Sequence, residues 1–212
     1  AVVSRGGGRA AMMKEVHNLI GVKEETSGME FLGVGNEQLE EYGCDIHRDM
    51  VSSCTRSSDD KIQLSGNSGE YTAEMVVLAT GFNDKRPEPP LPRTGRGLHY
   101  CLHCDAHMFV DESVYVMGHA ESTAHVAGIM LNFTDEVDIL LRGHDPEWSE
   151  ETQGIIDRHP IDVIHADVTG VQNGEDGWLK ALEFDDGTVR EYKGGFAMYG
   201  SEYNNSLARE LG

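Results

Sequence analysis

The pattern of apolar and polar positions is clearest in the second half of the chain. Residues 114–117 are consecutively apolar and end at Gly118, which predicts a buried strand followed by a turn. Between 121 and 133 the apolar residues recur at helical spacing, on a face broad enough to be buried. A second apolar run covers residues 137–141. Together these segments predict a strand, a helix and a parallel strand, which is the minimal βαβ unit.

The segments that follow favour short strands joined by turns. A polar helix is expected near 149–158, and one further strand at 195–200. Between them, an Asp-Asp-Gly turn at 185–187 separates two strand-like runs, which is typical of a β-hairpin. The predicted strands here are 163–164, 178–184 and 188–192.

The first half has weaker patterning. Residues 75–79 form a continuous apolar run that predicts a strand buried on both faces. A short helix is expected at 36–42, with Asn36 as its N-cap and Gly43 as its stop. The other expected segments are a strand end at 1–4, a glycine loop at 5–9, a weak helix at 12–20, a strand at 46–51, a loop at 52–60 and a strand at 62–64.

The proline-rich stretch 86–92 predicts a stiff connector and therefore a domain boundary. We expect a first domain at 1–94, a second at 95–196, and a tail at 197–212 that returns to the first. The fold class predicted from these elements is α/β.

Charge narrows the possible partners and the setting of the protein. The formal net charge is −20, from 17 Lys and Arg against 37 Asp and Glu. Such a field repels nucleic acid and anionic membrane surfaces, and no apolar run has the length of a membrane span. Because the chain also has regular strand patterns, the acidity indicates a haloadapted folded protein in a salt-rich cytoplasm, with self-repulsion destabilising it in dilute buffer.

Cys101 and Cys104 carry the most informative chemistry. Cysteines three apart can lie in one turn and close a small disulfide ring. When an electron donor opens the ring, one sulfur is free to attack a partner disulfide and the other can resolve the adduct, which closes the ring again. Asp105 follows directly and places a carboxyl group where it can move protons. The remaining cysteines, Cys44 and Cys54, are expected to be buried structural thiols.

A degenerate dinucleotide fingerprint follows the predicted strand at 114–117. Its glycine positions hold Gly118, Ala120 and Thr123. The methyl group of Ala120 lies where backbone would approach a pyrophosphate, so weaker binding is expected. Ser122 offers a hydroxyl at the helix start, and Glu121 complements the helix dipole.

Taken in order, these motifs resemble the low-molecular-weight thioredoxin reductase family. The segment 16–21 is similar to the one that runs along the flavin, and 78–81 is similar to the strand end that closes the first part of the FAD domain. Residues 95–101 lead into the cysteine pair, Gly118 begins the nicotinamide-binding domain, and 195–200 resembles the return to the FAD domain. The family's first glycine fingerprint and its C-terminal FAD segment are absent, so an internal piece of a longer reductase is expected.

The resemblance implies an α/β fold with two Rossmann-like nucleotide-binding domains, each with three layers that combine a parallel sheet with a β-hairpin or meander layer, and with the FAD domain incomplete. It also implies a disulfide reductase that uses FAD, with electrons from NADPH or another donor, and a homodimer. Its substrate would be a thioredoxin-like protein or a small disulfide. It places Cys104 against the flavin, Cys101 against the partner and Asp105 as the acid/base. The implied cofactor contacts are His17, Asn18, Thr80 and Gly81, the fingerprint residues 118 and 120–123, and Arg142 for the NADP 2′-phosphate.

Two other functions remain open. One is a dithiol oxidase of the same fold, which shares every motif and differs in its partner. The other is a non-catalytic metal-binding module, in which Cys101, Cys104 and His107 would act as ligands with His99 or His103 nearby. A structural zinc site usually needs a second separated ligand pair, and the sequence shows none.

Overall fold

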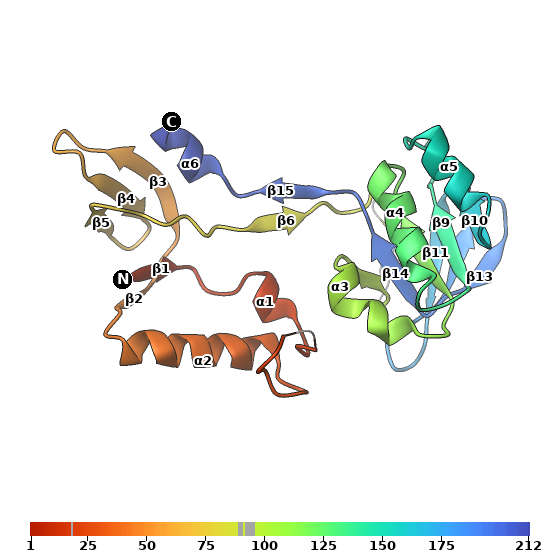
Figure 1. Cartoon of the computed structure of the whole chain (residues 1–212), viewed down its shortest axis with the longest axis horizontal. Coiled ribbons are helices and arrows are strands. Elements are labelled where there is room, and N and C mark those ends of the chain that lie inside the picture. Colours follow the sequence, from red (N-terminus) through yellow and green to blue (C-terminus); the bar gives the residue numbers. More distant parts are fainter. Residues whose placement is uncertain (18, 89–90, 92–95) are drawn as a thin grey trace. The chain divides into compact units, whose positions relative to one another are not determined.

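The computed structural model describes residues 1–17, 19–88, 91 and 96–212, and the chain divides into two compact units (Figure 1). Unit 1 comprises 1–83 and 202–212, and unit 2 comprises 84–201. The sequence placed these boundaries at 94 and 196. The strands β6 (Phe82–Asp84) and β15 (Ser201–Tyr203) pair at the positions where the chain leaves unit 1 and returns to it. This strand pairing therefore lies at the division between the units, before the proline-rich stretch.

Unit 2 contains a five-stranded parallel sheet with the order β10-β9-β8-β14-β7. The central strand β8 pairs with β9 and β14, and each partner extends the sheet in one direction. The helix α4 (Glu121–Met130) connects β8 to β9 and packs on both strands, as the predicted βαβ unit requires. The strands are β7 (Leu98–His99), β8 (Val114–Met117), β9 (Val137–Leu140), β10 (Ile161–Ile164) and β14 (Gly194–Ala197).

Alternate residues of β8 face different layers. Val114 and Val116 belong to a core shared with α4 and with α5 (Glu150–Ile156). Tyr115 and Met117 face the other way, into a core shared with the antiparallel sheet. That sheet consists of β11 (Val168–Asn173), β12 (Leu179–Phe184) and β13 (Val189–Glu191). Unit 2 thus has three layers: helices, parallel sheet and antiparallel meander.

The α/β class and the layered arrangement predicted from the sequence are confirmed. The predicted segments of unit 2 also match closely, because strand 114–117 has the predicted bounds and the helix begins at Glu121. The helix ends at Met130, before the predicted end at residue 133, and the residues that follow form a non-helical turn.

Unit 1 is smaller and has a thinner core. The strands β1 (Val2–Ser4) and β2 (Ile46–Arg48) form a parallel pair, and three further strands form an antiparallel meander. These are β3 (Val51–Arg56), β4 (Ile62–Gly66) and β5 (Glu70–Ala73). The C-terminal helix α6 (Ser206–Leu211) packs on β3, so that Leu207 joins Cys54, Ile62 and Leu64 in the core.

Two helix predictions in unit 1 were wrong. The main helix, α2 (Gly28–Glu41), has Ser27 as its N-cap and begins at Gly28, not after Asn36. Ser27 and Glu30 form a reciprocal capping box there, and Glu30 Oε2 lies 2.8 Å from the backbone nitrogen of Ser27. Because its internal glycines lower helix propensity, the sequence pattern did not predict its first two turns. The expected helix at 12–20 is replaced by α1 (Arg9–Met12) and irregular backbone.

Two strand predictions also need correction. Residues 52–56 belong to β3 and not to a loop, because their backbone pairs with β4 although their side chains are polar. The apolar run 75–79 lies between β5 and β6, belongs to no strand and is not buried on both faces. Met75 and Val77 are 86% and 92% exposed, whereas Val76 and Leu78 pack on the unit 1 core.

In the part of the chain that the structure describes, no helix is long and apolar enough to cross a membrane.

Candidate functional site

Cys101 and Cys104 form a disulfide with their Cα atoms 5.2 Å apart. Cys101 immediately precedes the short helix α3 (Leu102–Asp105). Its carbonyl oxygen accepts hydrogen bonds from the backbone N–H groups of Cys104 and Asp105, both at 3.2 Å. This turn brings the two cysteines together as their spacing predicted. Both residues are half-buried, so the structure leaves the pair partly accessible to solvent.

The turn is fastened to the core of unit 2. Leu102 and Ala106 are buried and belong to the core cluster that includes Phe109 and Phe196. Phe109 lies in the 3-10 helix η1 (Ala106–Phe109) that continues α3, and Phe196 lies in β14. A disulfide whose flanking residues are packed this way has a fixed position on the parallel sheet.

Asp105 is bonded to His99, a contact that the sequence did not predict. The Nδ1 atom of His99 lies 2.8 Å from Oδ2 of Asp105. The two side chains are 14% and 31% exposed. His99 ends strand β7, six residues before Asp105, and no periodicity in the sequence signals a contact between a strand end and the following helical turn.

Gly118 makes the turn between β8 and α4 that the fingerprint predicts. Its φ is +143°, in the region that favours glycine. A Cβ atom there would lie 2.5 Å from Oγ1 of Thr123 and 3.0 Å from the carbonyl oxygen of Met198. The glycine is therefore needed for close packing of the turn, whatever ligand it receives.

The other fingerprint residues are largely engaged with the protein itself. Ala120 is the N-cap residue of α4 and makes no side-chain cap bond. The Glu121 carboxylate accepts hydrogen bonds from the Thr152 hydroxyl and the Ser149 backbone at the start of α5, which lower its pKa. Ser122 is exposed, whereas Thr123 is fully buried and its hydroxyl has no hydrogen-bond partner among the residues that the structure describes.

Arg142 lies inside unit 2. Its side chain is 1% exposed and its Nε atom lies 2.7 Å from Oδ1 of Asp167. At the edge of the parallel sheet where its strands end, the rings of His119 and His144 stack with centroids 4.5 Å apart. The ring of Tyr199 meets His119 edge-on. Sequence reasoning missed this ring stack, because its members follow three different strands.

The residues at this edge fit a dinucleotide only in part. The glycine turn and the start of α4 are present, but a buried ion pair holds Arg142 and a carboxylate occupies the first helical position. A phosphate at a helix N-terminus is favoured by backbone N–H groups and by nearby cations. The start of α4 supplies backbone N–H groups, but the Glu121 carboxylate adds negative charge there, which disfavours binding of a phosphate.

The residues that the resemblance assigns to the flavin lie in unit 1. Thr80 and Gly81 are hydrogen-bonded to Asn204, including a 3.0 Å bond from the Asn204 backbone N–H to the Gly81 carbonyl. His17 pairs with Glu15 at 2.9 Å. Asn18 lies outside the described residues. These described side chains bond to protein groups and do not by themselves enclose a flavin.

The remaining cysteines are separate from the disulfide. Cys54 is buried in unit 1, where burial and the nearby Glu210 carboxylate raise the pKa of its thiol. Cys44 is half-buried. Among residues 1–17, 19–88, 91 and 96–212, no group of three or more His, Cys, Asp or Glu side chains could hold a metal ion.

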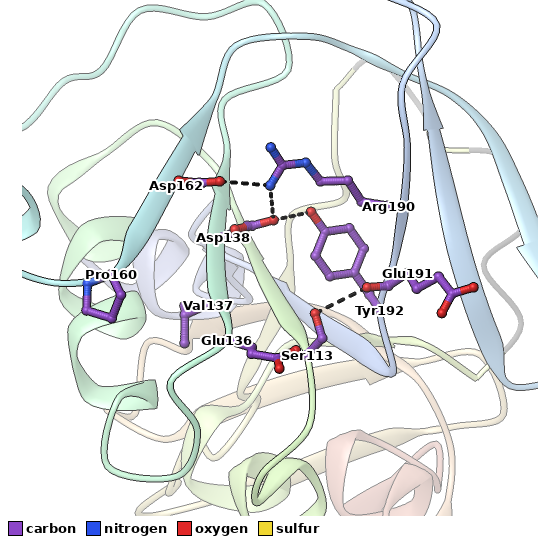
Figure 2. A pocket seen from close by; sticks show the side chains of 9 residues that line it. All are labelled: Ser113, Glu136, Val137, Asp138, Pro160, Asp162, Arg190, Glu191 and Tyr192. Carbon is purple, nitrogen blue, oxygen red and sulfur yellow. Dashed lines mark hydrogen bonds and ion pairs between the residues drawn. The ribbon is translucent and has the colours of Figure 1, made fainter.

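A cavity of about 440 Å³ lies at the opposite edge of the parallel sheet, where β8, β9 and β10 begin (Figure 2). Arg190 from β13 reaches Asp138 at 2.9 Å and Asp162 at 3.0 Å. The Tyr192 hydroxyl donates to Asp138 at 2.5 Å, and burial followed by this bond raises the pKa of Tyr192. The network ties the antiparallel meander to the parallel sheet.

We expect the replacement Asp138→Asn to destabilise unit 2. It removes the charged acceptor of two hydrogen bonds, and bonds to charged groups contribute about 1.5–3 kcal/mol each. Asp162→Asn is the matched control, because its side chain is 68% exposed and such a pair contributes about 0–1 kcal/mol. Urea unfolding of both variants measures the difference. Equal losses of unfolding free energy would show that the network does not join the layers.

The fold and the site together define a class of protein: a Rossmann-like α/β domain that carries a disulfide in a helical turn. Comparison with known proteins agrees. The family model described as "Pyridine nucleotide-disulphide oxidoreductase" matches residues 10–158. The chain belongs to this family, within which its relatives are the thioredoxin reductases that the sequence resembles.

Two curated relatives and one solved structure illustrate the likeness. The thioredoxin reductase of Peptoclostridium litorale is 33% identical over 138 residues, which are 64% of this chain and 44% of that protein. That of Aquifex aeolicus is 26% identical over 91% of this chain and 62% of its own length. The crystal structure of thioredoxin reductase from Streptococcus pyogenes shares the fold, with a TM-score of 0.85 at 22% identity, covering 97% of this chain and 69% of that one.

Proposed function

We propose that Cys101 and Cys104 are the redox-active pair of a flavin-dependent disulfide reductase of thioredoxin reductase type. The observation that carries the proposal is the disulfide in the turn of α3, half-buried and followed directly by the carboxylate of Asp105. Membership of the family supports this proposal. The chain spans 44% of the length of its relative from Peptoclostridium litorale.

The proposed exchange begins from the reduced pair. The Cys101 thiolate attacks one sulfur of the partner disulfide, forming a mixed disulfide and releasing the partner's other thiolate. The Cys104 thiolate then attacks the Cys101 sulfur, which re-forms the ring and releases the second partner thiolate. Two electrons pass to the partner, whose two thiolates take up two protons. Asp105, placed in the same turn, is the group we assign to proton exchange.

FAD is the cofactor that the family implies, and it would supply the two electrons that reopen the ring. We propose NADPH or another donor as the source of these electrons. The Glu121 carboxylate is hydrogen-bonded to the start of α5, and the buried Arg142 side chain is paired with Asp167. Because neither side chain is placed to favour a phosphate, these contacts support a donor other than NADPH.

The partner we propose is a thioredoxin-like protein or a small disulfide. The relatives bear the name thioredoxin reductase, which supports the protein partner. We further propose a homodimer in a salt-rich cytoplasm. The net charge of −20 supports haloadaptation, since an acidic surface is kept soluble and compact by screening ions.

Trapping of a mixed disulfide tests the proposal and the two cysteine roles. Thioredoxin with its second active-site cysteine replaced, and its first activated as a mixed disulfide with thionitrobenzoate, is incubated with Cys104→Ser and separately with Cys101→Ser. We expect a covalent complex to form at least about tenfold faster with Cys104→Ser, because it retains the attacking thiol. Equal rates in the two variants would contradict the assigned roles. No complex with either would contradict the protein partner.

A further inference from the structure

Three aromatic side chains lie together at the edge of the parallel sheet where the strands end. His119 follows the end of β8, Tyr199 follows the end of β14, and His144 follows the end of β9. These three strands are neighbours in the sheet. The rings of His119 and His144 stack at an interplanar angle of 28°, and the ring of Tyr199 lies edge-on to His119 with centroids 6.2 Å apart. The three rings therefore extend across the ends of adjacent strands.

This is the place where a sheet of this type receives a dinucleotide. Ligands of open α/β sheets bind outside the carboxyl ends of the strands, where the strand order reverses. Here β9 lies on one side of β8 and β14 on the other, so the reversal falls at β8. The pyrophosphate lies against the turn after the first strand, and the ribose is held near the end of the second. His119 lies in that turn and His144 follows that second strand, so their stacked rings join the two positions.

The segment 144–149 is fastened across the turn that contains His119. The backbone N–H of Glu147 donates to the His119 carbonyl at 2.6 Å. The backbone N–H of Ser149 donates to the Glu121 carboxylate at 2.9 Å. Because both ends of the turn are bonded to this segment, the segment and its histidine ring are held over the start of α4.

Charge at this edge opposes the same ligand. Glu121 occupies the first position of α4, and the segment 145–151 adds four further carboxylates. Arg142 also follows β9, but its side chain is 1% exposed and is paired with Asp167. Since like charges repel, these carboxylates disfavour the phosphates of a dinucleotide, most strongly at low ionic strength.

We infer that the stacked rings of His119 and His144 and the carboxylate of Glu121 close this edge, so that the chain binds neither NADPH nor NADH there. The rings exclude the ligand by occupying its place, and the carboxylate repels its phosphates. The consequence for the reaction rests on the proposed function: the electrons that open the disulfide of Cys101 and Cys104 come from a donor that does not bind at this edge.

Retention of NADPH by the protein during ultrafiltration tests the closure. The protein is used at about 0.1 mM with a trace of NADPH, in dilute buffer and again in about 2 M potassium chloride, where the Debye length is below about 3 Å and charge repulsion is screened. We expect less than about a tenth of the NADPH to be retained in both, which corresponds to a dissociation constant above about 1 mM. NADH is measured in the same way.

Substitutions separate the rings from the charge. His119→Ala combined with His144→Ala removes both rings, and Glu121→Gln removes the charge while its amide oxygen can still accept the Ser149 bond. We expect the triple variant to bind NADPH at least about tenfold more tightly than the wild type, retaining about half of it. Glu121→Gln alone should retain no more than the wild type in molar salt, because the rings remain.

Glu136→Gln is the matched control for removal of a carboxylate. Glu136 lines the cavity at the opposite edge of the sheet (Figure 2). This variant should retain as little NADPH as the wild type in both buffers. Melting temperatures establish that each variant is folded. His144 is exposed, so His144→Ala alone, with the gain in retention expected in the same direction, replaces the triple variant if that one does not fold.

Each outcome decides the inference. Retention of more than about a tenth of the NADPH by the wild-type protein would overturn it. A folded ring variant that retains no more than the wild type would also overturn it, because another feature would then exclude the ligand. The measurement needs no flavin and no disulfide partner. A protein that excludes NADPH and lacks reductase activity would remove the proposed function and leave this inference standing, and one that reduces disulfides and retains NADPH would do the reverse.

Discussion

Replacing Cys104 with serine is expected to abolish disulfide reduction by the FAD-loaded protein, lowering the rate by at least about a thousandfold. The variant cannot close the ring that Cys101 and Cys104 form, so the mixed disulfide with the partner has no thiol to resolve it. Cys101→Ser should lose activity to the same extent, because no attacking thiol remains. Turnover is followed by the thiols released from an insulin–thioredoxin mixture or from a small aromatic disulfide.

Cys44→Ser is the matched control for this loss. Cys44 is a free, half-buried thiol in unit 1, and Cys101 and Cys104 belong to unit 2. Its replacement should leave turnover within about twofold, since surface substitutions usually change stability by less than about 0.5 kcal/mol. Residual turnover above one tenth of the wild-type rate in Cys104→Ser would show that the reduction does not pass through the pair.

Gly195→Ala is expected to cost unit 2 about 3 kcal/mol of unfolding free energy, which is a large part of the roughly 5–15 kcal/mol that stabilises an ordinary domain. Gly195 lies in β14, opposite Tyr115 of β8. An added Cβ atom would lie 2.2 Å from the Tyr115 carbonyl oxygen and 2.5 Å from a carbon of its ring. Tyr115 is fully buried, with its hydroxyl bonded to the Gly97 carbonyl at 3.0 Å, so it has no room to move.

Gly128→Ala provides the comparison. Gly128 lies inside α4, and a Cβ atom there has no neighbour within 4 Å. Alanine in a helix is favoured over glycine by about 0.5–1 kcal/mol, so this variant should be slightly more stable than the wild type. Circular dichroism and urea unfolding distinguish the two variants. A Gly195→Ala protein that unfolds at the wild-type urea concentration would contradict the close packing of β14 on β8.

The sequence was most informative where structure depends on local patterns. The βαβ unit of 114–141 was predicted because its apolar runs are bounded by glycine and its helix has a regular buried face. The cysteine pair was predicted for the same reason: three residues of spacing are enough to close a disulfide within one turn.

Predictions failed where distant segments decide the outcome. The polar strand β3 exists because its backbone pairs with β4, which its side chains do not reveal. The run 75–79 is apolar on both sides, yet only one side is covered by the described core of unit 1. The helix α2 was missed at its start because three glycines weaken its propensity, although the Ser27 and Glu30 capping box was visible in the sequence.

The candidate site shows the same limit. Asp105 was predicted from its position after Cys104, but its partner His99 comes from the end of a strand. Arg142 was assigned to a phosphate through the family resemblance, and the structure places it in a buried ion pair with Asp167. A charged residue near a fingerprint has several possible partners, and three-dimensional packing determines which one it meets.

The central claim is that Cys101 and Cys104 form a redox-active pair and not a structural disulfide. The most direct measurement is the equilibrium of this disulfide with dithiothreitol buffers of known potential, read by alkylation and mass spectrometry of the peptide that contains both cysteines. The account predicts a single two-electron transition with a midpoint above about −300 mV, in the range of disulfides that exchange with thioredoxin. A pair that stays oxidised in buffers well below about −300 mV would be a structural disulfide and would contradict the account.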